Sequence, residues 1–250
     1  LGCKLNFAET STIARTFPHE KFERVSADSH ADIYVINTCT VTDTADRKCR
    51  QAVRKFVHHN PDAFIAVVGC YAQLRREEAA SIEGVDLVLG TYEKFDIARY
   101  IDNLEKRTAP EIHSCESVDT VGFMSSWSAG DRTRSFLKVQ DGCDYHCSYC
   151  TVPLARGKSR NLAVSEIVAE AEKIAASGVR EIVLTGVNVG DFGKSTGETL
   201  EQLLESLLKV NGLERLRLSS IEPNLVTDRI IDIISEGRVL LPHFHMPLQS

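Results

Sequence analysis

The chain has 250 residues, a net charge of −6, 43% hydrophobic and 26% charged residues, and eight cysteines. This composition is typical of a globular protein with one large or two ordinary domains. Its apolar runs are too short to span a bilayer, no leader-like stretch opens it, and its acidic balance argues against broad coating of nucleic acid. We therefore expect a cytoplasmic protein with no membrane partner, whose reduced thiols serve metal ligation rather than disulfides.

The first hundred residues alternate between predicted strands and helices. Short apolar runs predict strands at 33–37, 64–68 and 85–89, and helices are expected at 45–57, 75–82 and 96–104. Continuous apolar strands joined by helices are typical of a parallel sheet covered on both faces. The sequence therefore predicts an α/β domain with a parallel sheet over residues 1–105. Because the chain opens on Leu1, on what reads as the end of a strand, we expect a fragment of a longer protein.

Residues 106–131, rich in serine with proline and glycine, interrupt this pattern and predict a connector that could contain edge strands. A second series follows, with strands expected at 136–140, 181–185, 215–219 and 243–247 and helices at 164–176, 200–210 and 227–235. Four strand–helix units in a row describe the first half of a (β/α) barrel. Residues 132–250 are therefore predicted to form an incomplete barrel domain.

The most specific motif is the C-x3-C-x2-C triplet of Cys143, Cys147 and Cys150. Three cysteines can ligate three irons of a cubane cluster and leave the fourth open, whereas electron-transfer clusters normally take four cysteines. S-adenosylmethionine binds such an open iron in the radical enzymes that use it. The alternative, a zinc knuckle, is disfavoured because the sequence offers no second cysteine pair of that type.

A second set, Cys3, Cys39 and Cys70, follows strand-like or turn-like elements of the first domain. The ends of parallel strands converge on one edge of a sheet, so these thiols could hold a second cluster that is also open at one iron. Each of them could instead be a small buried hydrophobic residue. Cys49 and Cys115 fit neither set and are expected to pack.

Four short motifs give the chain a resemblance to a known family. They are GCKLN at 2–6, NTCTVT at 37–42, GCYAQ at 69–73 and QDGC at 140–143. Together they resemble the radical S-adenosylmethionine methylthiotransferases, and within them the branch that acts on N6-threonylcarbamoyladenosine in tRNA. The branches that act on isopentenyladenosine or on a ribosomal protein typically have different residues at these motifs. A non-catalytic metal-binding RNA module is the alternative of another class.

The resemblance implies a function for each cysteine set. Cys143, Cys147 and Cys150 would hold the 4Fe-4S cluster that binds and cleaves S-adenosylmethionine. Cys3, Cys39 and Cys70 would hold an auxiliary 4Fe-4S cluster that carries or supplies the methylated sulfur. The implied partner is the anticodon stem-loop of tRNA, with an electron donor and a sulfur source that the sequence does not identify. The second half of the barrel and a C-terminal RNA-binding domain would lie outside this chain.

Other residues are candidates because of their position in the predicted elements. Strand ends on the active face of the barrel offer residues to bind S-adenosylmethionine, namely Gly186, Asn188, Glu222 and Gln249. Basic residues that could neutralise phosphates follow both cysteine sets, namely Arg47, Lys48, Arg50, Arg54, Lys55, Arg156, Lys158 and Arg160. A solvated helix face explains the first five about as well. We expect Arg156 or Lys158 to pair with the carboxylate of the modified base, and His243 and His245 to pack in the barrel.

Overall fold

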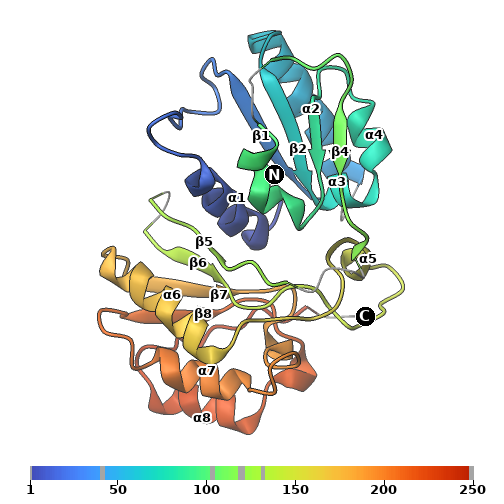
Figure 1. The fold of residues 1–250 in the computed structure, drawn as a ribbon. Coiled ribbons are helices and arrows are strands. Elements are labelled where there is room, and N and C mark those ends of the chain that lie inside the picture. Colours follow the sequence, from blue (N-terminus) through green and yellow to red (C-terminus); the bar gives the residue numbers. More distant parts are fainter. Residues whose placement is uncertain (1, 40–42, 102–104, 118–121, 131–132, 248–250) are drawn as a thin grey trace. The chain divides into compact units, whose positions relative to one another are not determined.

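The computed structural model describes residues 2–39, 43–101, 105–117, 122–130 and 133–247 (Figure 1). The chain forms two compact units, and neither is a single continuous stretch. The first unit combines Leu1–Met124 with His146–Gly157, and the second combines Ser125–Tyr145 with Lys158–Ser250. The part of the chain with Cys147 and Cys150 therefore packs with the N-terminal unit. The predicted domain boundaries at 105 and 131 stay a prediction.

The first unit contains the parallel sheet that the sequence predicts. Its strands are hydrogen-bonded in the order β1 (Ile33–Thr38), β2 (Phe64–Gly69), β3 (Leu87–Leu89) and β4 (Glu111–His113). All three pairings are parallel, and Thr38 at the end of β1 lies opposite Gly69 at the end of β2. Strand β4 arises from the predicted connector. The carboxyl ends of β1 and β2 therefore lie side by side, directly before Cys39 and Cys70.

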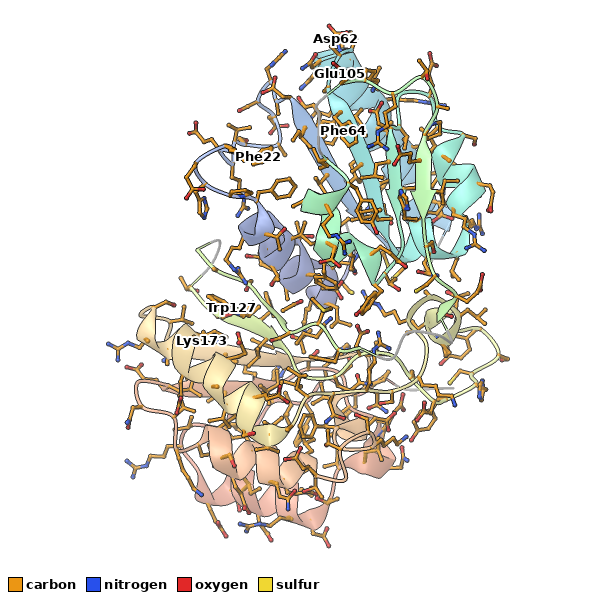
Figure 2. The ribbon with its side chains drawn as sticks, in the orientation of Figure 1. Phe22, Asp62, Phe64, Glu105, Trp127 and Lys173 are labelled. Atoms are coloured by element: carbon orange, nitrogen blue, oxygen red, sulfur yellow. The ribbon has the colours of Figure 1, made fainter. Side chains whose placement is uncertain are left out.

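Both faces of this sheet are covered, as the uninterrupted apolar strands predict. The unit contains helices α1 (Lys4–Thr16), α2 (Asp43–His59), α3 (Cys70–Leu74), α4 (Arg76–Ala80) and α5 (Val152–Arg156), and a 3-10 helix η1 (Glu93–Arg99). On one face Ile65 and Val67 of β2 pack in a core with Val53 of α2. On the other face Phe64, labelled in Figure 2, shares a core with Ile13 of α1.

Two expectations for the first unit are wrong. No strand ends at residues 2–3, the first described residues, because residues 4–16 form helix α1 and Cys3 lies at its N-terminal boundary. The helix expected at 96–104 is instead the 3-10 helix η1, which begins earlier and has a non-helical residue, Asp96, inside it. Residues 102–104 lie outside the described residues. The other predicted strands and helices of this unit are confirmed to within a few residues.

The second unit is built on a sheet in the order β5 (Ser126–Trp127), β6 (Ser135–Lys138), β7 (Glu181–Thr185) and β8 (Arg215–Leu218). β5 is antiparallel to β6, and the other pairings are parallel. Helices α6 (Val164–Ala176), α7 (Leu200–Leu207) and α8 (Asp228–Glu236) contribute to one core with the strands. Trp127 of β5 packs against this core, whereas Lys173 of α6 lies on the exposed side of its helix and bonds Glu170 (Figure 2).

The fourth parallel strand expected at 243–247 is not formed among the described residues. Among the described residues one isolated bridge connects this segment to the sheet, Ser220 with His245, and a second joins Leu216 to Leu240 just before the segment. Pro242 and Pro247 flank the segment, and proline has no N–H to donate to a strand ladder. His243 and His245 are exposed, so the expectation that they pack in the barrel is wrong. The unit therefore contains three parallel strands of the expected half-barrel.

No helix within the described ranges is long and apolar enough to cross a membrane.

Candidate cluster and cofactor sites

The N-terminal cysteines, by which we mean Cys3, Cys39 and Cys70, lie at the boundaries of three elements. Cys3 immediately precedes helix α1, Cys39 follows β1, and Cys70 follows β2 as the first residue of α3. Cys39 and Cys70 thus come directly after paired residues of two neighbouring parallel strands. Cys39 and Cys70 therefore lie at strand ends, as predicted, whereas Cys3 lies at the start of a helix.

Asn6 joins the start of α1 to the end of β1. Its side-chain Nδ2 donates to the carbonyl oxygen of Thr38 at 2.7 Å, and the Cys3 thiol lies 3.6 Å from its Oδ1. Gly2 permits this close approach, because a Cβ at that position would lie 2.8 Å from the Cβ of Cys39. The structure therefore draws Cys3 and Cys39 toward the same edge of the sheet.

The three thiols differ in their exposure and electrostatic surroundings. Cys3 is exposed, Cys39 is half-buried and Cys70 is buried. Burial raises the pKa of the Cys70 thiol, whereas the positive charges of Arg156 and Lys94 act to lower that pKa. The negative charge of a Cys39 thiolate raises the Cys70 pKa further, which reflects how near these two residues lie. Cations beside a buried thiol favour the thiolate form that metal ligation requires.

No group of three or more His, Cys, Asp or Glu side chains in the described ranges is arranged to hold a single metal ion. A cubane cluster makes a different demand, because each thiolate binds its own iron and the sulfur ligands need not converge on one point. Three cysteines at one sheet edge, one of them beside buried cations, fit a cluster better than a lone ion.

The cysteines of the C-x3-C-x2-C motif are half-buried. Cys143 belongs to the second unit, whereas Cys147 and Cys150 belong to the first. The backbone N–H of Cys150 donates to the carbonyl of Cys147 at 3.0 Å, which closes a tight turn between these two residues. Half-exposed thiols on an irregular loop, as here, are accessible to a ligand.

Gln140 fixes the backbone just before Cys143. Its Nε2 donates to the carbonyl of Gly142 at 2.7 Å and to Ser159 Oγ at 2.9 Å, and its Oε1 accepts from the N–H of Asn188 at 3.0 Å. This fully buried side chain therefore connects the cysteine loop to the end of β7. The sequence analysis missed this role, although a polar residue that ends an apolar strand beside the motif is a signal for it.

Three of the four candidate cofactor residues lie together around Gln140. A Cβ at Gly186 would lie 2.8 Å from Gln140 Oε1, and Asn188 Oδ1 accepts from the N–H of Glu222 at 3.2 Å. The Nδ2 of Asn188 is buried and has no hydrogen-bond partner among the described residues. A buried unsatisfied donor costs roughly 1–3 kcal/mol, so this atom fits a site where a ligand supplies the acceptor. Gln249 lies outside the described residues.

Asp191 was also missed by the sequence analysis. It is fully buried, and burial raises the pKa of its carboxyl although Lys194 Nζ lies 2.9 Å away and opposes the shift. Lys194 Nζ is also 3.8 Å from Asp144, the residue after Cys143. Asp144 in turn accepts from the N–H of Ser159 at 3.0 Å. These contacts fix the start of the cysteine loop within the second unit.

The expectation that Arg156 pairs with a substrate carboxylate is wrong. Its side chain is 4% exposed, and its guanidinium donates to both carboxylate oxygens of Glu9, at 2.9 and 3.0 Å. It also donates to Asn6 Oδ1 at 3.1 Å. Lys158 is exposed, and Arg160 is buried with its guanidinium 3.4 Å from Asp141. Of the three basic residues after Cys150, Lys158 alone presents its side chain to solvent.

Helix α2 has the other basic residues on its exposed face, namely Arg47, Lys48, Arg54 and Lys55. Arg50 is half-buried and pairs with Glu78 of α4. Cys49 on the same helix is fully buried, and burial raises the pKa of its thiol to about 12, which confirms that this cysteine packs. Cys115 is half-buried and its N–H donates to Glu93 at 2.7 Å.

Comparison with known proteins gives a family for both parts of the chain. Residues 1–90 match the Uncharacterized protein family UPF0004, and residues 137–250 match the Radical SAM superfamily. The first match contains the N-terminal cysteines and the second contains the C-x3-C-x2-C motif. The fold is also similar to that of the radical S-adenosylmethionine methyltransferase TsrM from Kitasatospora setae, with a TM-score of 0.55 and 16% identity over 95% of this chain and 54% of that one.

This is therefore an α/β protein whose second part, residues 137–250, matches the Radical SAM superfamily. Among curated relatives, the Threonylcarbamoyladenosine tRNA methylthiotransferases MtaB of Bacillus subtilis and Aquifex aeolicus are 38% and 37% identical over the whole chain. The tRNA-2-methylthio-N(6)-dimethylallyladenosine synthase of Syntrophomonas wolfei is 31% identical. The chain spans 56%, 62% and 57% of the lengths of these three relatives. The chain is therefore similar over its whole length to radical S-adenosylmethionine methylthiotransferases.

Proposed function

We propose that the protein inserts a methylthio group at C2 of N6-threonylcarbamoyladenosine 37 in tRNA, in the cytoplasm. The observation that carries this proposal is that each region with a family match contains its own cysteine triplet. The branch is supported by five relatives named for threonylcarbamoyladenosine, at 33–38% identity. The relative named for dimethylallyladenosine is less similar, at 31%.

The C-x3-C-x2-C cysteines, together with residues of the second unit, would form the cofactor site. Cys143, Cys147 and Cys150 would ligate one 4Fe-4S cluster, which together with S-adenosylmethionine supplies the one-electron chemistry that activates an adenine carbon. Asn188 would donate its buried Nδ2 to the cofactor. Gly186 lets Gln140 pack closely against the end of β7, because a Cβ there would lie 2.8 Å from Gln140 Oε1.

The residues of the first unit would hold the second cluster. Cys3, Cys39 and Cys70 would ligate it. Asn6 would hold Cys3 near Cys39 through its contacts with the Cys3 thiol and with the carbonyl of Thr38. The exposed basic face of α2 would contact tRNA phosphates, since phosphate binding needs only a local cationic patch on an acidic protein.

Metal content tests the two-cluster proposal. Full-length protein purified without oxygen should be brown and contain about eight irons per chain, as two cubanes require. Cys147→Ala and Cys39→Ala should each lose about half of this iron. Cys49→Ala is the matched control. Cys49 is buried in the core, so this variant should keep all of the iron. Bound zinc, or iron unaffected by Cys39→Ala, would instead indicate a metal-binding module of another class.

The same variants should separate the two steps of the reaction. Cys147→Ala should abolish cleavage of S-adenosylmethionine, while Cys39→Ala should still cleave it and yet transfer no sulfur. Formation of 5′-deoxyadenosine is the readout of the first step, and methylthiolated nucleoside is the readout of the second. Normal methylthiolation by Cys39→Ala would show that the N-terminal cysteines are only structural.

Three tRNA substrates test the branch. The full-length enzyme should methylthiolate tRNA that contains N6-threonylcarbamoyladenosine, and neither isopentenyladenosine tRNA nor unmodified tRNA. An unpaired base in a loop can be read by its exposed edges, which suits recognition of the N6 substituent. Equal turnover of isopentenyladenosine tRNA would overturn the branch assignment and leave the family assignment standing. Turnover of a ribosomal protein alone would exclude a tRNA substrate.

A further inference from the structure

Three charged side chains are buried together in the first unit. Glu9 on α1 and Lys94 on η1 are completely buried, and Arg156 on α5 is 3% exposed. Lys94 Nζ lies 2.7 Å from Glu9 Oε2, and the guanidinium of Arg156 binds both Glu9 oxygens. We refer to these three residues as the buried triad. It joins elements separated by 85 and 147 residues of sequence.

Stability alone does not account for such a group. Burying an ion costs several kcal/mol even after relaxation, and buried ion pairs can often be replaced by apolar residues with no loss of stability. Two of its three members are cations, and both are completely or almost completely buried. An arrangement that is costly to bury suggests a nearby anionic group that benefits from these cations.

The contacts of Arg156 show where that group would be. Its guanidinium bonds Asn6 Oδ1 at 3.1 Å, the same oxygen that lies 3.6 Å from the Cys3 thiol. The other atom of this amide, Nδ2, bonds the carbonyl of Thr38, the residue before Cys39. One hydrogen-bonded side chain therefore separates the triad from two of the N-terminal cysteines.

Cys70 is connected to the triad through its own helix. Its side chain is buried. Helix α3, which Cys70 begins, packs against α5, which Arg156 ends. Thr91, shortly before Lys94, also donates from Oγ1 to the carbonyl of Ala155 at 3.0 Å. All three N-terminal cysteines thus adjoin elements that the triad holds together.

We propose that the buried triad is a positioning and charge-compensating element for the cluster of the N-terminal cysteines. It seats the segment His146–Gly157, which contains Cys147 and Cys150, on the N-terminal sheet. Its two buried cations offset the negative charge of the three thiolates. This inference rests on the proposed function in one respect, namely that the N-terminal cysteines bind an iron–sulfur cluster.

The charge has a measurable consequence for that cluster. The reduction potential of an iron–sulfur cluster depends on the net charge and hydrogen bonds around it. A nearby positive charge favours the reduced form, so removing it should lower the potential. Lys94→Met and Arg156→Met each remove one positive charge and leave a neutral pair with Glu9, so neither leaves an isolated buried anion.

The experiment uses full-length protein in which Cys143, Cys147 and Cys150 are replaced by alanine, so that one cluster remains. Both methionine variants should lower its reduction potential by at least about 59 mV, a tenfold change in the one-electron equilibrium. Lys106→Met is the matched control. Lys106 also bonds a buried carboxylate of this unit, Asp86, at 3.0 Å, but it lies at the opposite end of the strands, beside Ala63. The Lys106→Met variant should destabilise the fold without changing the reduction potential of the cluster.

Amide hydrogen exchange separates positioning from charge. Arg156→Met should accelerate exchange in 146–157, whereas Lys94→Met, which keeps the Arg156–Glu9 bonds, should do so less. Arg156→Lys keeps the charge but loses the two parallel bonds, so it should loosen the segment while retaining the potential. If Lys94→Met does not fold, the two Arg156 variants decide the question by the same criteria.

The outcomes distinguish this inference from the proposed function. Iron that stays bound with a potential unchanged in both methionine variants would overturn the inference and leave the cluster assignment intact. A background protein that binds no iron at all would overturn the cluster assignment itself.

Discussion

Gly69 offers a sharp test of how the N-terminal cysteines are positioned. It ends β2, immediately before Cys70, with φ +97° and ψ −154°. This backbone conformation is essentially restricted to glycine, and other residues are strained there by about 1–3 kcal/mol. A Cβ at this position would also lie 2.8 Å from the carbonyl oxygen of Thr38. Gly69→Ala should therefore be destabilising and should displace Cys70 from Cys39.

The magnitude follows from these two effects. Overpacking against a backbone atom that cannot rotate away costs about 1–3 kcal/mol more, so we expect a total loss of about 2–6 kcal/mol. Gly178 after α6 provides the comparison, because it also has a positive φ, +90°, but a Cβ there would meet nothing within 4 Å. Gly178→Ala should show the conformational cost alone, about 1–2 kcal/mol.

Urea denaturation of the apoprotein and iron analysis of the reconstituted protein measure the two consequences. Gly69→Ala should lower the free energy of unfolding more than Gly178→Ala, and it should lose about half of the bound iron, the share of one of two cubanes. Gly178→Ala should keep its iron. The reasoning fails if both variants are equally destabilised, or if Gly69→Ala is clearly destabilised and still binds iron in full.

Two further predictions concern single side chains. Asn188→Ala removes the buried Nδ2 donor. It should weaken the binding of S-adenosylmethionine, measured by calorimetry, by about tenfold, which corresponds to the loss of one good hydrogen bond. Asn224 is exposed in the same unit, so Asn224→Ala should leave this affinity unchanged. Equal affinities of the wild type and Asn188→Ala for S-adenosylmethionine would show that Asn188 is not part of the cofactor site. The hydrogen bond from Arg50 holds the pKa of Glu78 below its usual value. Its stabilising contribution is therefore present at neutral pH and lost as the pH falls through that lowered pKa. The stability difference between wild type and Glu78→Gln should shrink on acidification, while the exposed Glu77→Gln should show little difference at any pH.

Segments with a simple apolar pattern were predicted well from the sequence. Helix α6 and strand β7 have the predicted bounds, because α6 repeats apolar residues at helical spacing and β7 has a continuous apolar centre, Ile-Val-Leu. Helix α1 was missed for the opposite reason. Its buried face includes Asn6 and Glu9, and polar residues on an inward face disguise helical periodicity.

The predicted site shows the same division between local and distant information. The spacing of Cys143, Cys147 and Cys150 is a local pattern, so it was visible in the sequence. The buried triad was not, because a lone charged residue is normally exposed and nothing nearby indicates a partner 147 residues away. Such a contact forms only when tertiary folding brings distant segments together, which is why Arg156 was misassigned to the substrate.

The two cysteine sets are held by the same chemical device. At the N-terminal cysteines, the amide of Asn6 bonds the backbone carbonyl of the residue before Cys39. At the C-x3-C-x2-C motif, the amide of Gln140 bonds the backbone carbonyl of the residue before Cys143. A carboxamide can donate and accept at once, so it fixes the backbone in two directions. It is also neutral, so it adds no negative charge beside thiolates that already repel one another. Neutral amides therefore fix the backbone beside the cysteines in both units. In the N-terminal unit, the positive charge near the thiolates comes from separate residues, those of the buried triad.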